Sequence, residues 1–138
     1  MAEPNKLIEV EGIGPEFARK LELAGAKTTK DLLVLAKTPT DREKLAEKSG
    51  ISGTLILKWA NHADLMRIGG IGGEYAEFLE TLGVNTVNEL ATRNPEMLYA
   101  AVKSFDLSKK PIIRQKPSIN DIKTWINHAK RLEPTLTY

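Results

Sequence analysis

The sequence contains no cysteine among its 138 residues. Disulfide bonds, thiolate nucleophiles and thiolate metal sites are therefore excluded. No apolar run approaches the roughly 18 residues of a transmembrane helix, so we expect no membrane association. Residues 1–20 contain four glutamates and no apolar h-region, which predicts that no secretory signal is present. These absences agree with the reducing cytoplasm, which is where we expect the protein.

The sequence motifs of common enzyme classes are also missing. There is no Ser-His-Asp constellation, no HExxH and no Walker loop. Residues 69–73 are rich in glycine, but no predicted strand precedes them and no Lys-Ser/Thr pair follows. The two histidines, His62 and His128, are too few for a zinc site, and we expect them to pack or to form hydrogen bonds. We therefore expect a non-enzymatic protein without a metal or cofactor.

Charge is plentiful and unevenly distributed. Apolar residues make up 41% of the chain and charged residues 28%, which is typical of a globular domain. The formal net charge is only +2. Residues 65–100, however, carry two basic and five acidic side chains, whereas residues 101–138 carry eight basic and three acidic ones. The C-terminal third of the chain is therefore basic and could form an electrostatic patch.

The chain contains an internal repeat. Residues 10–18 recur as residues 68–76, and this offset of 58 makes ten of the 26 positions in residues 8–33 identical to their counterparts. A second match pairs residues 59–63 with residues 125–129, both of which contain Trp-x-x-His-Ala, at an offset of 66. Repeats on this scale are typical of a duplicated supersecondary unit.

The difference between the two offsets predicts an insertion in the second copy. The best candidate is the basic insertion around residues 108–117, whose two prolines and four cationic side chains favour a loop. We therefore expect a first unit over residues 1–64 and a second unit over residues 65–138. The two units are expected to pack into one compact globular domain.

Apolar spacing predicts an all-α fold of about eight to ten short helices. Phe17, Leu21 and Ala24 recur at helical intervals, and no stretch shows sustained strand alternation. Trp59 and Trp125 fall on apolar stripes and are expected to anchor the core. The predicted helix-end signals are C′ glycines at Gly25 and Gly83, Thr-x-x-acid capping boxes at Thr28, Thr40 and Thr86, Asn94 before Pro95, and serines at Ser52 and Ser118.

Each copy has a glycine turn, which we define as residues 10–14 in the first copy and residues 68–72 in the second. A turn of this kind leaves backbone N–H groups unpaired at the start of the following helix. With the helix dipole, these groups attract an anion such as phosphate, and glycine allows the anion to come close. We expect Ile13 and Ile71 to point inward. The alternative is a purely structural corner that packs two helices tightly.

Gly-Ile-Gly-Pro at residues 12–15 and Gly-Ile-Gly-Gly at residues 70–73 are each followed by a helix, a glycine and Thr-x-x-Asp/Glu-Leu. Both segments resemble helix-hairpin-helix motifs, and the resemblance implies binding of DNA backbone through turn amides. Asp-Leu-Met-Arg-Ile-Gly-Gly-Ile-Gly at residues 64–72 and the Trp-x-x-His-Ala helices are similar to a bacterial family of tandem helix-hairpin-helix proteins. That family has no established function.

The charges near the turns depart from the superfamily pattern, which places Lys or Arg beside the turn. Glu16 and Glu74 follow the turns and would oppose phosphate binding, so the basic insertion is the expected source of positive charge. No aromatic residue lies between Lys109 and Lys116 to stack on bases. The candidate nucleic-acid-binding residues are Gly12, Ile13, Gly14, Glu16, Gly70, Ile71, Gly72, Gly73, Glu74, Lys109, Lys110, Arg114 and Lys116.

Two hypotheses follow from the sequence. The first is a small protein that binds the backbone of DNA or RNA without sequence specificity, because contacts to phosphate do not identify bases. The second is a module that binds a protein partner or a small anionic ligand, in which the glycine turns serve only as structure. The basic insertion also has two interpretations, an electrostatic contact surface and a solvated loop.

Overall fold

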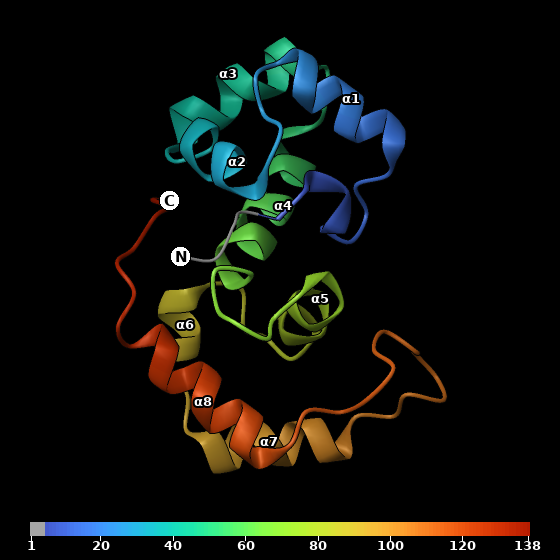
Figure 1. Ribbon diagram of the computed structural model, residues 1–138, viewed down its shortest axis with the longest axis vertical. Coiled ribbons are helices and arrows are strands. Elements are labelled where there is room, and N and C mark those ends of the chain that lie inside the picture. The colour runs from blue at the N-terminus through green and yellow to red at the C-terminus, as the bar shows by residue number, and fades with distance from the viewer. Residues whose placement is uncertain (1–4) are drawn as a thin grey trace. The chain divides into compact units, whose positions relative to one another are not determined.

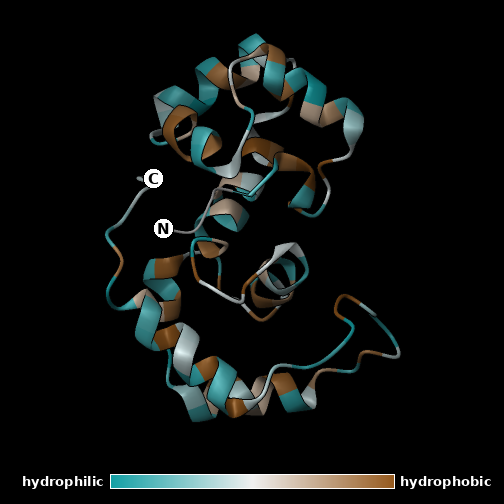
Figure 2. Ribbon diagram, in the orientation of Figure 1, coloured by the Kyte–Doolittle hydropathy of each residue, from teal (hydrophilic) through white to brown (hydrophobic). Residues whose placement is uncertain are grey.

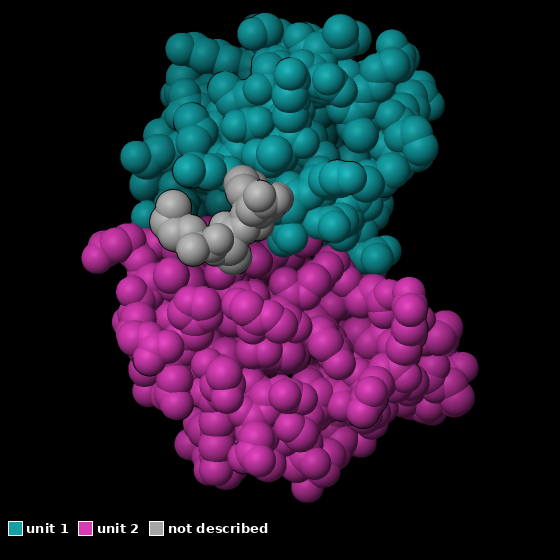
Figure 3. Space-filling model, viewed as in Figure 1, with its two compact units in different colours: residues 1–64, 134–138 teal, residues 65–133 magenta. Residues whose placement is uncertain are grey.

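The computed structural model describes residues 5–138; residues 1–4 of the first predicted unit lie outside this range. The chain divides into two compact units. Unit 1 contains residues 1–64 and 134–138, and unit 2 contains residues 65–133 (Figure 3). Within the described range the fold is all-α, with eight α-helices, as the sequence predicts. None of these helices has both the length and the apolar character needed to cross a membrane.

Unit 1 is built from short helices (Figure 1). Helix α3 packs against α1 and α2, and the single-turn 3-10 helix η1 packs against α1. Leu21, Leu32 and Ile56 are fully buried. The elements of unit 1 are η1 (Leu7–Glu9), α1 (Pro15–Leu23), α2 (Thr29–Leu35), α3 (Pro39–Ser49) and α4 (Gly53–Leu65).

Unit 2 is organised around its last helix, α8, which packs against α6 and α7. Hydrophobic and hydrophilic residues alternate along α8, as expected of a helix with one buried face (Figure 2). The loop between α7 and α8, residues 105–118, contains the predicted basic insertion, and we call it the basic loop. The helices of unit 2 are α5 (Gly73–Thr81), α6 (Val87–Ala91), α7 (Pro95–Ser104) and α8 (Ile119–Ala129).

Most of the predicted helix ends are confirmed. Gly25 and Gly83 have φ angles of +108° and +91° directly after α1 and α5, as the C′ position requires. The capping box at Thr28 forms in full, and the hydrogen bond from the Lys27 backbone N–H helps to lower the pKa of Asp31. Asn94 caps α7, with proline at its first position. Local capping chemistry therefore sets most helix boundaries in this chain.

Two helix starts differ from the prediction. The expected capping box at Thr40 and Glu43 is wrong, because α3 begins at Pro39 with Thr38 as its N-cap. A proline favours the first helical position and keeps the residue before it extended, which suits an N-cap. At α6, Thr86 accepts a hydrogen bond from the Glu89 N–H, but the Glu89 carboxylate binds the N–H of Asn85 and the Thr86 hydroxyl instead of completing the box.

The segment of residues 134–138, which was predicted to belong to the second unit, lies on unit 1. The Thr137 N–H donates to the carbonyl of Lys37 at 2.8 Å. Thr135 donates its hydroxyl hydrogen bond to the Asp64 carboxylate at 2.8 Å. Leu136, which lies between Thr135 and Thr137 in the sequence, is buried. Side chains distant in sequence thus anchor the segment, which explains why local patterns did not place it.

Arg42 connects this segment to the rest of unit 1. It is only 7% exposed, and its guanidinium donates to the carbonyls of Ala36 at 2.9 Å and Thr137 at 2.8 Å. The guanidinium also lies 5.5 Å from the centre of the Tyr138 ring, within the range of a cation–π interaction. Arg42 stabilises unit 1 because its planar guanidinium has several N–H donors, which satisfy more than one backbone carbonyl at once.

We expect Arg42→Ala to destabilise unit 1 by about 2–3 kcal/mol, because the change leaves buried carbonyls without their charged donor. Urea unfolding in a Trp125→Phe background measures this loss, since Trp59 of unit 1 is then the sole tryptophan. Lys44→Ala on the exposed surface of the same helix is the matched control. Equal losses for the two variants would contradict a structural role for Arg42.

Candidate nucleic-acid interface

The glycine at the third position of each turn is constrained by the fold. Gly12 and Gly70 both have φ of +91°, a conformation that side chains rarely adopt. A Cβ at Gly12 would lie 3.2 Å from Nε1 of Trp59, and a Cβ at Gly70 would lie 3.1 Å from Nε1 of Trp125. Both the backbone conformation and the adjacent indole therefore disfavour a larger residue at these two positions.

The indoles that face these glycines belong to the core. Trp59 on α4 is 1% exposed and Trp125 on α8 is 4% exposed, which confirms their predicted role as anchors. Each indole also contacts the aromatic ring that follows its turn. The Phe17–Trp59 and Tyr75–Trp125 ring centroids lie 5.0 and 5.2 Å apart. Each glycine turn is consequently held against a buried tryptophan of its own unit.

The last glycine of each turn has no such requirement. Gly14 and Gly72 have extended backbones, with φ of −88° and −94°, and a Cβ at either position would meet nothing within 4 Å. Each is the N-cap of the helix that follows, α1 or α5. Serine, asparagine and aspartate are better N-caps than glycine by roughly a few tenths of a kcal/mol, so local stability does not explain the choice.

The remaining helices of the described chain use side-chain caps. Hydroxyl or amide oxygens accept a hydrogen bond from the first turn of α2, α3, α4, α6, α7 and α8, and the capping residues are Thr28, Thr38, Ser52, Thr86, Asn94 and Ser118. The helices after the glycine turns are the exceptions, since α1 and α5 have no side-chain cap. Their first N–H groups are left to partners outside the helix.

The turn itself uses only part of its hydrogen-bonding capacity. Ile13 and Ile71 are buried, as predicted, and their N–H groups donate to the carbonyls of Val10 and Ile68 at 3.1 Å. Past each turn, the N–H groups of residues 16–17 and 73–75 have no acceptor among residues 5–138. The second turn offers one donor more than the first, because Gly73 occupies the position where the first copy has Pro15.

Each of the two acidic residues after the turns has a cationic partner. Glu16 lies 3.8 Å from Nζ of Lys20, one helical turn along α1. The Glu74 carboxylate lies 3.2 Å from a guanidinium nitrogen of Arg114, which comes from the basic loop. The structure thus brings one predicted loop residue, Arg114, directly to the second glycine turn. The carboxylates are paired, which reduces their repulsion of an incoming anion.

The basic loop is fastened to unit 2 at several points. The Tyr75 hydroxyl donates to the carbonyl of Gln115 at 2.8 Å, and Nζ of Lys116 donates to the carbonyl of Lys103 at 2.9 Å. Ile113 is buried, whereas the Arg114 side chain is 91% exposed. Lys109 and Lys110 are exposed farther along the loop. The loop therefore presents its cations to solvent from an anchored backbone.

Tyr75 and Gln115 are functional candidates that the sequence analysis missed. Tyr75 connects three parts of the site, because its ring contacts Trp125 and its hydroxyl holds the basic loop. Burial, and the negative charges of Asp121 and Glu74, raise the pKa of Tyr75, so the phenol keeps the proton that it donates to Gln115. The available signal was the aromatic residue common to both copies, Phe17 and Tyr75, after each turn.

No group of three His, Asp or Glu side chains in residues 5–138 is arranged to hold a metal ion.

A family model described as a domain of unknown function, DUF4332, matches residues 11–132. The chain belongs to this family. The DUF4332 match includes both glycine pairs and the basic loop, and it agrees with the expected membership of a family without an established function. No match was found among curated proteins or among solved structures.

Gly70 and Gly72 should respond differently to the same substitution. We expect Gly70→Ala to destabilise unit 2 by at least about 1–2 kcal/mol, because a side chain at positive φ is strained and the Trp125 indole must also move. Gly72→Ala should cost less, about 0.5 kcal/mol, because its Cβ meets open space and the loss comes only from alanine being a poorer N-cap than glycine. Urea unfolding in a Trp59→Phe background, followed by Trp125 fluorescence, compares them. Similar losses would show that both glycines are structural.

Proposed function

We propose that this DUF4332 protein is a non-enzymatic, sequence-nonspecific binder of nucleic-acid backbone, with duplex DNA as the primary partner. The glycine turns act as helix-hairpin-helix motifs in this proposal. Phosphate oxygens accept hydrogen bonds from the free N–H groups at the starts of α1 and α5, where the helix dipole adds a favourable field. Base edges take no part, so affinity is independent of sequence.

The observation that carries the proposal is the presence of glycine at positions 14 and 72. Neither backbone conformation nor packing demands glycine there, and a side-chain cap would be more stable. A glycine N-cap keeps the first N–H groups of the helix unoccupied and lets a phosphate approach the backbone closely. A ligand therefore accounts for a residue choice that the fold leaves unexplained.

The second turn is proposed as the stronger of the two sites. It has the additional donor at Gly73, and Arg114 of the basic loop lies beside it. Lys109, Lys110 and Lys116 add positive charge on the same loop. With about two to four phosphates neutralised, affinity stays weak and is expected to fall roughly ten- to a hundredfold between about 50 and 200 mM salt.

The first prediction of this function concerns Gly72→Asp. The carboxylate should both cap the free N–H groups of α5 and repel phosphate, so affinity for a short fluorescein-labelled DNA duplex should fall at least about tenfold. Fluorescence anisotropy at low salt measures affinity, and circular dichroism checks that the helices persist. Unchanged affinity with intact helices would favour the alternative, a module for a protein or small-anion partner in which the turns are structural.

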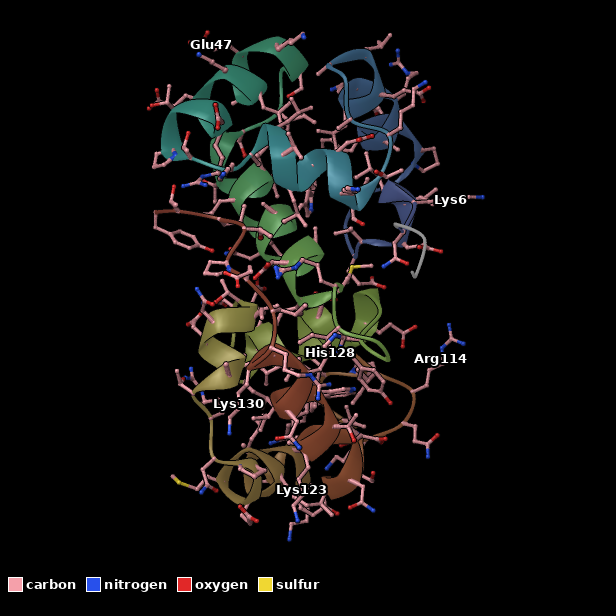
Figure 4. The ribbon with its side chains drawn as sticks, turned by 60° about the vertical axis from the view of Figure 1, so that its left-hand side comes forward. Lys6, Glu47, Arg114, Lys123, His128 and Lys130 are labelled. Carbon is pink, nitrogen blue, oxygen red and sulfur yellow. The ribbon has the colours of Figure 1, made fainter. Side chains whose placement is uncertain are left out.

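A second prediction separates the basic loop from the other cations of unit 2. Arg114 projects from the loop, whereas Lys123 and Lys130 project from α8 in other directions (Figure 4). Replacing Lys109, Lys110 and Arg114 by glutamate should weaken duplex binding at least about tenfold and flatten its salt dependence. Lys116 is left in place because it holds the loop through the Lys103 carbonyl.

The matched control replaces Lys123, Lys130 and Arg131 by glutamate, which changes the net charge by the same amount on exposed positions. Its effect on affinity should be clearly smaller than that of the loop variant. Equal effects would mean that only the total charge of the protein matters, and the basic loop would then have no special part in binding.

A further inference from the structure

We propose that Glu74 holds Arg114 beside the second glycine turn in place of a backbone phosphate, and that an incoming phosphate takes over Arg114 from Glu74. This inference rests on the proposed function and adds to it a means of regulating the same site. The pair would act as a weak internal competitor that sets the threshold for binding.

The geometry of the pair supports this role. Glu74 is the second residue of α5, so its carboxylate lies next to the N–H groups that are proposed to bind phosphate. The guanidinium of Arg114 is 3.2 Å from that carboxylate. The Arg114 side chain is 91% exposed, and it therefore reaches the pair from the solvent side, where a phosphate also arrives.

The basic loop is anchored on both sides of Arg114 in the sequence. Ile113, the preceding residue, is buried, and the following residue, Gln115, accepts the hydrogen bond of Tyr75 through its carbonyl. Tyr75 itself is the residue after Glu74. The two side chains of the pair thus project from neighbouring, mutually fastened segments of backbone. Arg114 can exchange one anionic partner for another without any rearrangement of the loop.

The chemistry favours the exchange. A guanidinium binds a carboxylate and a phosphate with the same planar pair of donors, so the two anions compete for one site. An ion pair this exposed to solvent is worth little, about 0–1 kcal/mol, so a phosphate that also receives the N–H groups of α5 can displace the carboxylate. In the free protein, the same pair lowers the affinity of Arg114 for other anions by at most about fivefold.

The first turn lacks this device. Glu16 pairs with Lys20 at 3.8 Å within the same helix, and the basic loop belongs to the other unit. An i,i+4 pair along a helix is a common surface interaction and does not bring a cation from elsewhere to the turn. The proposed regulation is therefore a property of the second turn alone.

A double-mutant cycle tests the inference with a short fluorescein-labelled DNA duplex and the full chain. Affinities are measured for the original protein, Glu74→Gln, Arg114→Gln and the double variant. Glu74→Gln removes both the repulsion of phosphate and the competition for Arg114, whereas in the Arg114→Gln background it removes the repulsion only. The gain in affinity from Glu74→Gln should therefore be about two- to fivefold larger when Arg114 is present.

Glu77→Gln, one turn farther along α5, is the control for loss of a negative charge from the same helix, and its effect should not depend on Arg114. Equal gains from Glu74→Gln in both backgrounds, or a smaller gain with Arg114 present, would overturn the inference while leaving the proposed function intact. Failure of the proposed function looks different: duplex binding would then be absent or insensitive to Gly72→Asp, and both ideas would fall together.

Discussion

The contact between a buried indole and a glycine at positive φ is the interaction on which both units depend. Trp59 reaches the first turn from α4 and Trp125 reaches the second from α8, so the last long helix of each unit holds its first turn in place. The helix after the turn is directed by this contact, and its first N–H groups are positioned as a consequence. The contact between tryptophan and glycine thus contributes to the packing of the core and also positions the N–H donors at the start of the next helix.

Within each turn, the glycine at positive φ has a conformational role, and the glycine at the helix N-cap has a chemical one. Gly12 and Gly70 adopt the positive φ of the turn where a side chain would be crowded. Gly14 and Gly72 leave the first N–H groups of a helix without a side-chain cap, at positions where other residues would fit. A repeated Gly-x-Gly pattern does not distinguish these roles, because it reports residue identity and not backbone angle. The φ angles and the positions of the neighbouring atoms make the distinction.

Features set by neighbouring residues were predictable from the sequence. The all-α class, most caps and the C′ glycines follow from side chains three or four positions apart, and these predictions are confirmed. The Glu74–Arg114 pair and the Tyr75–Gln115 hydrogen bond join residues 40 positions apart in the sequence. Such partners depend on how a loop folds back onto a helix. No local periodicity encodes that path, so this part of the candidate site was not predictable.

The placement of residues 134–138 on unit 1 has a consequence for biosynthesis. Unit 2 is, in topological terms, an insertion between two parts of unit 1, since the chain leaves unit 1 after Asp64 and returns to it with Pro134. A ribosome must therefore complete the whole of unit 2 before the carbonyl of Thr137 becomes available to Arg42. Until then, Arg42 of the nascent first unit lacks one of its acceptors, and the final consolidation of unit 1 waits for the synthesis of residues 134–138.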